Sequence, residues 1–120
     1  MQIGIPAEII AGETRVAATP DTVKKYIAAG HTVVVQAGAG VNASVPDANF
    51  SAVGASIVND AATAYASDII LKVQAPTAEE IALIKDGATV VAMFDPYRNA
   101  NLAAFAAKNL HCFALELLPR

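Results

Sequence analysis

The charged residues that could do chemistry in this sequence follow short apolar runs. Glu8 and Arg15 come after the first run, Lys72 ends the fourth, Asp95 follows the fifth and Glu116 the sixth. If these runs are parallel strands, their carboxyl ends meet at one edge of a sheet, where open α/β sheets bind ligands. Two cations at that edge could hold a carboxylate or phosphate group, or they could pair with the nearby acids.

Both alternatives stay open for the two cations. Arg15 lies in a loop between a first strand and a first helix, and it could bind an anion or pair with Glu8 or Glu13. Lys72 is carried by a rigid strand, where a charge is costly unless an anion neutralises it. The candidate anion or cleft residues are therefore Arg15, Lys72, Glu8 and Asp95.

Apolar runs and helical patterns alternate along the chain about every 20 to 25 residues. Helix starts are indicated by cap residues at Thr19, Asp60, Thr77 and Asn99. Strands are expected at 3–5, 32–35, 56–58, 68–73, 88–94 and 110–115, and helices at 20–30, 46–54, 60–66, 76–87 and 99–108.

This order predicts an α/β fold with a doubly wound, mainly parallel sheet of about six strands, similar to Rossmann or flavodoxin folds. Residues 1–120 are expected to form one domain. The sequence stops soon after the sixth strand, so we expect the final covering elements to lie beyond Arg120. An uncovered apolar face near Leu115 to Leu118 would favour a homodimer.

Composition excludes several functions. The 120 residues carry a net charge of −3 with scattered signs, which argues against a nucleic-acid partner. Apolar stretches are too short for insertion into a membrane. No residue spacing indicates a metal site, and neither His31 nor His111 has a nucleophile nearby. The single cysteine, Cys112, lies in an apolar run and is expected to be inert core packing.

A glycine-rich motif at 38–43 resembles a dinucleotide-binding fingerprint, with Asp60 about 20 residues further on. Such a fingerprint works only when its last small residue opens a helix that faces the pyrophosphate. Pro46 and Asp47 place the next helix start too late. We therefore interpret Gly38 and Gly40 as turn residues and expect no nucleotide to bind here.

Five segments together resemble the amino-terminal domain that alanine dehydrogenase shares with the alpha subunit of proton-translocating NAD(P) transhydrogenase. They are Gly4–Glu8, Glu13–Pro20, Gln36–Gly40, Ile70–Val73 and Glu116–Arg120. The resemblance runs the whole chain. In the dehydrogenase branch, the residues matching Arg15 and Lys72 grip the pyruvate carboxylate, and a histidine after the fifth strand is the acid/base.

The resemblance favours the transhydrogenase branch, because residues 93–97 contain no histidine and the chain ends in Leu-Pro-Arg. It implies a portion of an enzyme that passes hydride from NADH to NADP⁺ and couples this to proton translocation. NAD and NADP would bind in the complete enzyme, and neither a cofactor nor a catalytic residue is expected in this fragment, which would be inactive alone.

The same resemblance implies a beta subunit and a membrane portion as partners, and a peripheral position on the cytoplasmic side of the bacterial inner membrane. Two alternatives remain: an alanine dehydrogenase-like oxidoreductase domain, in which Asp95 would replace the histidine, and a stand-alone anion-binding module.

Overall fold

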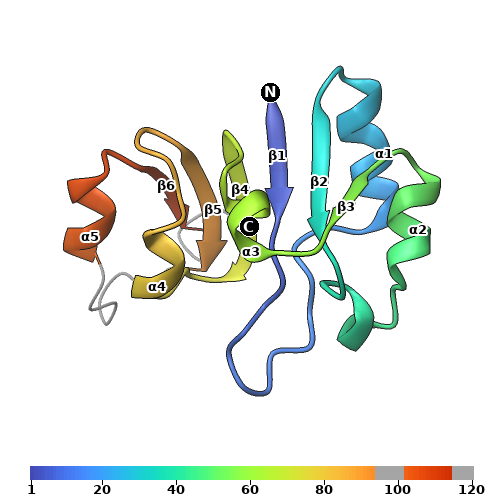
Figure 1. Ribbon diagram of the computed structural model, residues 1–120, viewed down its shortest axis with the longest axis horizontal. Helices are drawn as coiled ribbons and strands as arrows, with labels where there is room; N and C mark the ends of the chain where they lie inside the picture. The colour runs from blue at the N-terminus through green and yellow to red at the C-terminus, as the bar shows by residue number, and fades with distance from the viewer. Residues whose placement is uncertain (94–101, 115–120) are drawn as a thin grey trace.

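The computed structural model describes residues 1–93 and 102–114, which form one sheet of six parallel strands flanked by helices (Figure 1). The predicted α/β class and parallel sheet are confirmed. The strands are β1 (Gln2–Ile5), β2 (Thr32–Gln36), β3 (Ser56–Val58), β4 (Ile69–Gln74), β5 (Thr89–Met93) and β6 (His111–Ala114). Apolar and β-branched side chains in the inner strands suit a sheet that is covered on both faces.

The helices are α1 (Pro20–Ala28), α2 (Asp47–Ala52), α3 (Ala61–Tyr65), α4 (Ala78–Ile81) and α5 (Leu102–Ala107), with a 3₁₀ turn, η1 (Val41–Ala43). Two predicted caps are confirmed. Thr19 accepts a hydrogen bond from the Thr22 N–H at 3.2 Å, and Thr77 forms a reciprocal capping box with Glu80.

Two details of the predicted helices differ, and a third is not tested. Asp60 occupies the N-cap position of α3, but its side chain makes no capping hydrogen bond. The helix expected over 76–87 is a single α-turn, because the following N–H groups of Leu83 and Ile84 bond to carbonyls only three residues back. Asn99, the expected cap of the last helix, lies outside the described residues.

The strand order is β3-β2-β1-β4-β5-β6, so the chain winds outward in two directions from the neighbouring strands β1 and β4. A ligand crevice in such a sheet opens at this reversal, beyond the carboxyl ends of the strands. Strands β1 and β4 pair over only two positions, Ile3 with Ile69 and Gly4 with Ile70. Beyond that point the two strands need other contacts to stay together.

Two hydrophobic clusters form the core. The first joins β1 and β2 to Val23 of α1 and Phe50 of α2, and the second joins β4 and β5 to Tyr65 of α3, Ile81 of α4 and Phe105 of α5. Gly4 lets α3 approach β1, because a Cβ at this position would lie 2.1 Å from the Ala64 carbonyl oxygen.

Within the described residues, β6 forms one edge of the sheet and is the least covered strand. Its first three residues, His111, Cys112 and Phe113, are exposed. The expectation that Cys112 packs in the core is therefore wrong, because an apolar sequence run does not by itself place an edge strand under a helix. Residues 115–118, the expected dimer patch, lie outside the described residues.

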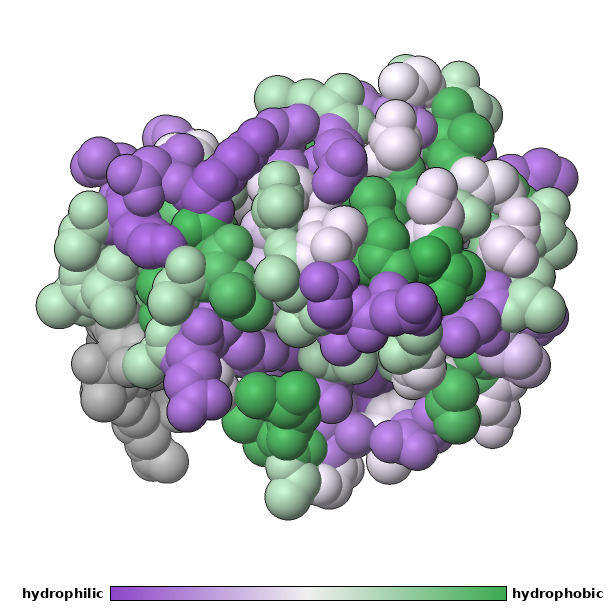
Figure 2. Space-filling view, viewed as in Figure 1, coloured by the Kyte–Doolittle hydropathy of each residue, from purple (hydrophilic) through white to green (hydrophobic). Residues whose placement is uncertain are grey.

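The loop between β1 and α1 extends past the carboxyl ends of the strands, at the bottom of Figure 1. Its tip carries Ile9 and Ile10, which are 59% and 42% exposed. Figure 2, in the same view, shows apolar surface where this loop projects. No helix in the described part of the chain is long and apolar enough to cross a membrane.

Candidate functional site

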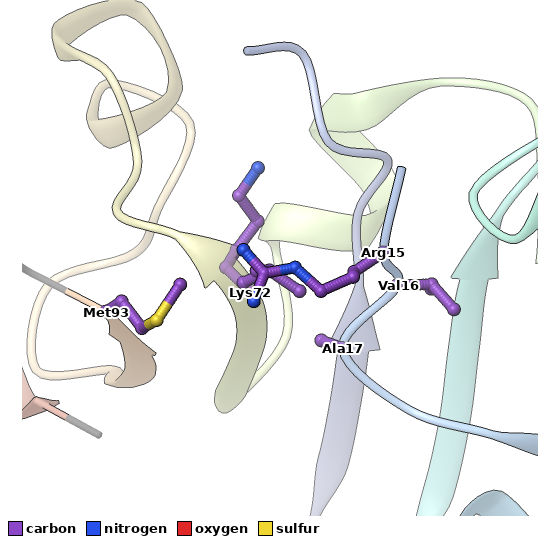
Figure 3. Close-up of a pocket in the computed structure, with 6 residues that line it drawn as sticks. Arg15, Val16, Ala17, Lys72 and Met93 are labelled. Carbon is purple, nitrogen blue, oxygen red and sulfur yellow. The ribbon is translucent and has the colours of Figure 1, made fainter. Parts of the chain in front are cut away.

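A pocket of about 260 Å³ opens at the carboxyl edge of the sheet, beside the reversal of strand order (Figure 3). The loop after β1 contributes Arg15, Val16 and Ala17, β4 contributes Lys72 and Val73, and β5 contributes its last residue, Met93. The two cations predicted to share one edge of the sheet thus line one pocket.

The Lys72 side chain is buried, and carboxylates of the protein itself balance its positive charge. Its Nζ lies 3.2 Å from Oε1 of Glu8 and 3.4 Å from Oε2 of Glu80, and it donates to the Ala7 carbonyl at 3.5 Å. Figure 3 shows the lysine ammonium pointing away from the Arg15 guanidinium. A buried ammonium group with two carboxylates needs no external anion to balance its charge.

Glu80 joins Lys72 to two further elements. Its Oε2 accepts a hydrogen bond of 2.5 Å from the Tyr65 hydroxyl, and its Oε1 accepts one of 2.9 Å from the Thr77 N–H. Burial, and then the hydrogen bond to Glu80, raise the pKa of the Tyr65 phenol above its ordinary value. The site therefore contains a neutral tyrosine that donates to a carboxylate.

Glu8 binds the end of β4 through the backbone. Its two carboxylate oxygens accept hydrogen bonds from the N–H groups of Val73 at 2.9 Å and Gln74 at 3.0 Å. Nearby, the Ala7 N–H donates to the Gln36 side chain at 2.9 Å, which ties the same loop to β2. The loop is thus fixed to both neighbours of β1.

Arg15 forms a two-pronged ion pair with Glu13. Its Nε donates to Oε2 at 2.9 Å and its Nη2 to Oε1 at 2.7 Å, while its backbone N–H also donates to Oε2. The Arg15 side chain is 60% exposed, whereas that of Glu13 is 5% exposed. Glu13 also accepts a hydrogen bond of 2.8 Å from the Gln74 side chain.

These contacts determine the charge state of Glu13. Hydrogen bonds from the Arg15 side chain, then from Gln74 and the Arg15 backbone, hold the pKa of Glu13 well below its ordinary value. Glu13 is therefore ionised throughout the physiological range, and Arg15 keeps a carboxylate partner.

The structure brings together three of the four predicted residues: Glu8, Arg15 and Lys72. Asp95 lies outside the described residues, as does Glu116. Sequence reasoning did not include Glu80 and Tyr65 among the site residues. The sequence indicated Thr77 only as a helix cap. The fold shows that Glu80 completes a capping box with Thr77 and that its carboxylate also reaches Lys72.

A backbone N–H group of the glycine-rich motif is already hydrogen-bonded to a nearby aspartate. The Gly38 N–H donates to a carboxylate oxygen of Asp47 at 2.9 Å, and the chain passes through η1 before α2 begins at Asp47. The predicted late helix start is confirmed. Within the described residues, no group of three or more His, Cys, Asp or Glu side chains is placed to hold a metal ion.

Comparisons with known proteins agree with this fold. The family model described as alanine dehydrogenase/PNT, N-terminal domain, matches residues 4–120. The NAD(P) transhydrogenase subunit alpha of Haemophilus influenzae is 42% identical over 100% of this chain and 23% of its own length. An alanine dehydrogenase of Halomonas elongata is 43% identical over 75% of this chain and 24% of its own length.

A solved structure, the transhydrogenase of Sinorhizobium meliloti, superposes with a TM-score of 0.95 at 41% identity, covering 100% of this chain and 36% of that chain. The chain thus spans between about a quarter and a third of the length of these relatives. The family match over nearly the whole sequence shows that this chain belongs to the alanine dehydrogenase/PNT family, as its N-terminal domain.

Proposed function

We propose that this chain is the N-terminal portion of an NAD(P) transhydrogenase alpha subunit, an enzyme that transfers hydride from NADH to NADP⁺ and couples the transfer to proton translocation. The proposal rests on the share of this chain that is similar to each kind of relative. Similarity to the Haemophilus influenzae alpha subunit runs through 100% of the chain, whereas similarity to the Halomonas elongata alanine dehydrogenase, at nearly equal identity, covers 75%.

Two features of the chain support a scaffold role rather than the dehydrogenase chemistry. Residues 93–97 contain no histidine to serve as the acid/base that the dehydrogenase branch uses there. The ammonium group of Lys72 is bound by Glu8 and Glu80, so it already has two anionic partners. In this proposal the domain forms one wall of a cleft, and NAD and NADP bind to other parts of the complete enzyme.

The same proposal implies partners for this domain and a position in the cell. The complete enzyme would contain a beta subunit and a membrane portion, and this domain would lie on the cytoplasmic side of the bacterial inner membrane without inserting into it. A homodimer is proposed from the exposed edge strand β6, where Phe113 is 54% exposed. Sedimentation of the chain at high micromolar concentration tests the dimer, and a monomer would contradict it.

The function is tested in membranes that contain the complete enzyme. We expect NADH to reduce NADP⁺, at a rate that changes when an uncoupler collapses the proton gradient. Membranes from a strain that lacks the gene for this chain serve as the control and should lose the activity. Reduction of NAD⁺ on addition of alanine, without transhydrogenation, would contradict the proposal and favour the dehydrogenase alternative.

A second candidate function is binding of a small carboxylate in the pocket, as a stand-alone anion-binding module would require. The observation that favours it is the position of Arg15, which lines the pocket with a side chain that is 60% exposed. Titration of the full chain with pyruvate tests this candidate separately, because it does not depend on other subunits.

A further inference from the structure

The Arg15 guanidinium group has two edges that can each hold a planar anion. One edge, formed by Nε and Nη2, is taken by the two carboxylate oxygens of Glu13. The other edge, formed by Nη1 and Nη2, makes no hydrogen bond to residues 1–93 or 102–114. A guanidinium group can bind a second carboxylate at this free edge, since its five N–H donors lie in one plane.

We propose that Glu13 is the positioning residue for Arg15: by holding the Nε–Nη2 edge, it leaves the Nη1–Nη2 edge available to a carboxylate in the pocket. The ligand part of this inference rests on the second candidate function above. Figure 3 shows Arg15 reaching from its loop toward the strand that bears Lys72, which is the direction this role requires.

Glu13 is itself held by the end of β4. The Gln74 side chain donates to Oε1 of Glu13 at 2.8 Å, and the Gln74 backbone N–H donates to Glu8 of the same loop. The loop therefore contacts β4 through two carboxylates, five residues apart, on either side of its exposed tip. An exposed arginine would otherwise sample many rotamers, so this anchoring lowers the entropic cost of ordering it on a ligand.

Removing the carboxylate of Glu13 has two opposing effects on anion binding: it removes a repelling charge, and it removes the group that positions Arg15. Glu13→Gln deletes a negative charge next to the pocket, so electrostatics alone would strengthen the binding of an anion. Glutamine cannot accept both guanidinium hydrogen bonds, because its amide nitrogen is a donor. If Glu13 acts by positioning Arg15, the variant should bind an anion more weakly despite its more favourable charge.

The first experiment measures the position of Arg15 without any ligand. Solvent exchange of its side-chain Nε–H is followed by NMR in the full chain and in two variants. We expect Glu13→Gln to accelerate exchange about tenfold or more, because a charge-assisted hydrogen bond is lost. The matched control is Glu79→Gln, which removes the charge of an exposed acid in α4 and should leave the exchange unchanged.

Gln74→Met is a second variant in case Glu13→Gln fails to fold. It keeps the carboxylate and removes only the side-chain donor that holds it, so exchange at Arg15 should rise, though by less. If neither variant changes the exchange rate at Arg15, the positioning role is wrong.

The second experiment titrates the full chain with pyruvate and follows the backbone amides of Val16, Ala17 and Val73. We expect binding to weaken about tenfold or more in Arg15→Lys, which has no planar fork, and severalfold in Glu13→Gln. Glu79→Gln should bind like the wild type. Equal or tighter binding by Glu13→Gln would overturn the positioning role.

The two experiments separate the inference from the function on which its ligand part rests. If the wild type does not bind pyruvate while Glu13→Gln still accelerates exchange at Arg15, the carboxylate-binding candidate is wrong and the fixing of Arg15 by Glu13 stands.

Discussion

The carboxylate of Glu8 accepts a hydrogen bond of 2.9 Å from the backbone N–H of Val73, 65 positions later in the sequence. This contact lies beyond the point where β1 and β4 stop pairing, at Gly4 and Ile70. A second bond, from the Gln74 N–H, uses the other carboxylate oxygen. One side chain thus accepts hydrogen bonds from two half-buried backbone N–H groups of β4 that lie beyond its pairing with β1.

Glu8→Gln should destabilise the protein, because the amide nitrogen that replaces one carboxylate oxygen is a donor and cannot accept a hydrogen bond from the N–H group that faces it. We expect a loss of about 1–3 kcal/mol in the free energy of unfolding, measured by urea denaturation. Glu79→Gln, at an exposed position, is the control. Equal midpoints for the two variants would show that the backbone contacts of Glu8 contribute nothing.

Lys72→Met should be more damaging. It leaves the carboxylates of Glu8 and Glu80 buried without their shared cation, and we expect a loss of about 3–5 kcal/mol in the free energy of unfolding. The same substitution at the exposed Lys24 removes an equal charge and should change the stability little. If the two lysine variants unfold at the same urea concentration, the ion cluster is not a stabilising feature.

The ion pair of Glu13 with Arg15 should persist in mild acid. The folded-state pKa of Glu13 lies below its ordinary value of 4.5, so its stabilising contribution is present above pH 4.5 and is lost as the pH falls toward the folded value. A plot of unfolding free energy against pH should therefore be steeper below pH 4.5 in the wild type than in Glu13→Gln. Parallel curves for the two proteins would contradict the lowered pKa of Glu13.

Tyr65 should remain protonated in alkaline solution. Burial and the bond to Glu80 raise its pKa above 10.0, so the stability linked to this group is fully present below pH 10.0 and falls as the pH rises toward the folded-state value. Ultraviolet titration of the folded protein should show one tyrosinate fewer than titration of the unfolded chain. In Tyr65→Phe the difference between the two titrations should be smaller by one tyrosinate, and early ionisation of Tyr65 in the wild type would refute the assignment.

The chain should not bind NADH through its glycine-rich motif. The Gly38 N–H already donates to Asp47, and a carboxylate at this position repels a pyrophosphate group. Calorimetric titration of the full chain should therefore show no binding at micromolar NADH. Micromolar affinity that disappears in Gly38→Val would mean that the motif is a nucleotide site after all.

The sequence was enough to predict the alternation of strands and helices, the parallel sheet and two of the helix caps, because these follow from local periodicity and from short-range hydrogen bonds. It also placed Glu8, Arg15 and Lys72 at one edge, since the carboxyl ends of parallel strands coincide. The late start of α2, which separates the glycine motif from a helix, could likewise be predicted from Pro46 and Asp47.

Which charged side chains pair with one another depends on contacts between elements that are far apart in the sequence. Lys72 pairs with Glu80 because α3 and α4 bring Tyr65 and the capping-box carboxylate over the end of β4, and no local pattern encodes that approach. Arg15 pairs with Glu13 rather than Glu8, because Glu8 is occupied by the backbone of β4. The exposure of Cys112 follows from the position of β6 at the sheet edge, a property of strand order that an apolar run of sequence does not contain.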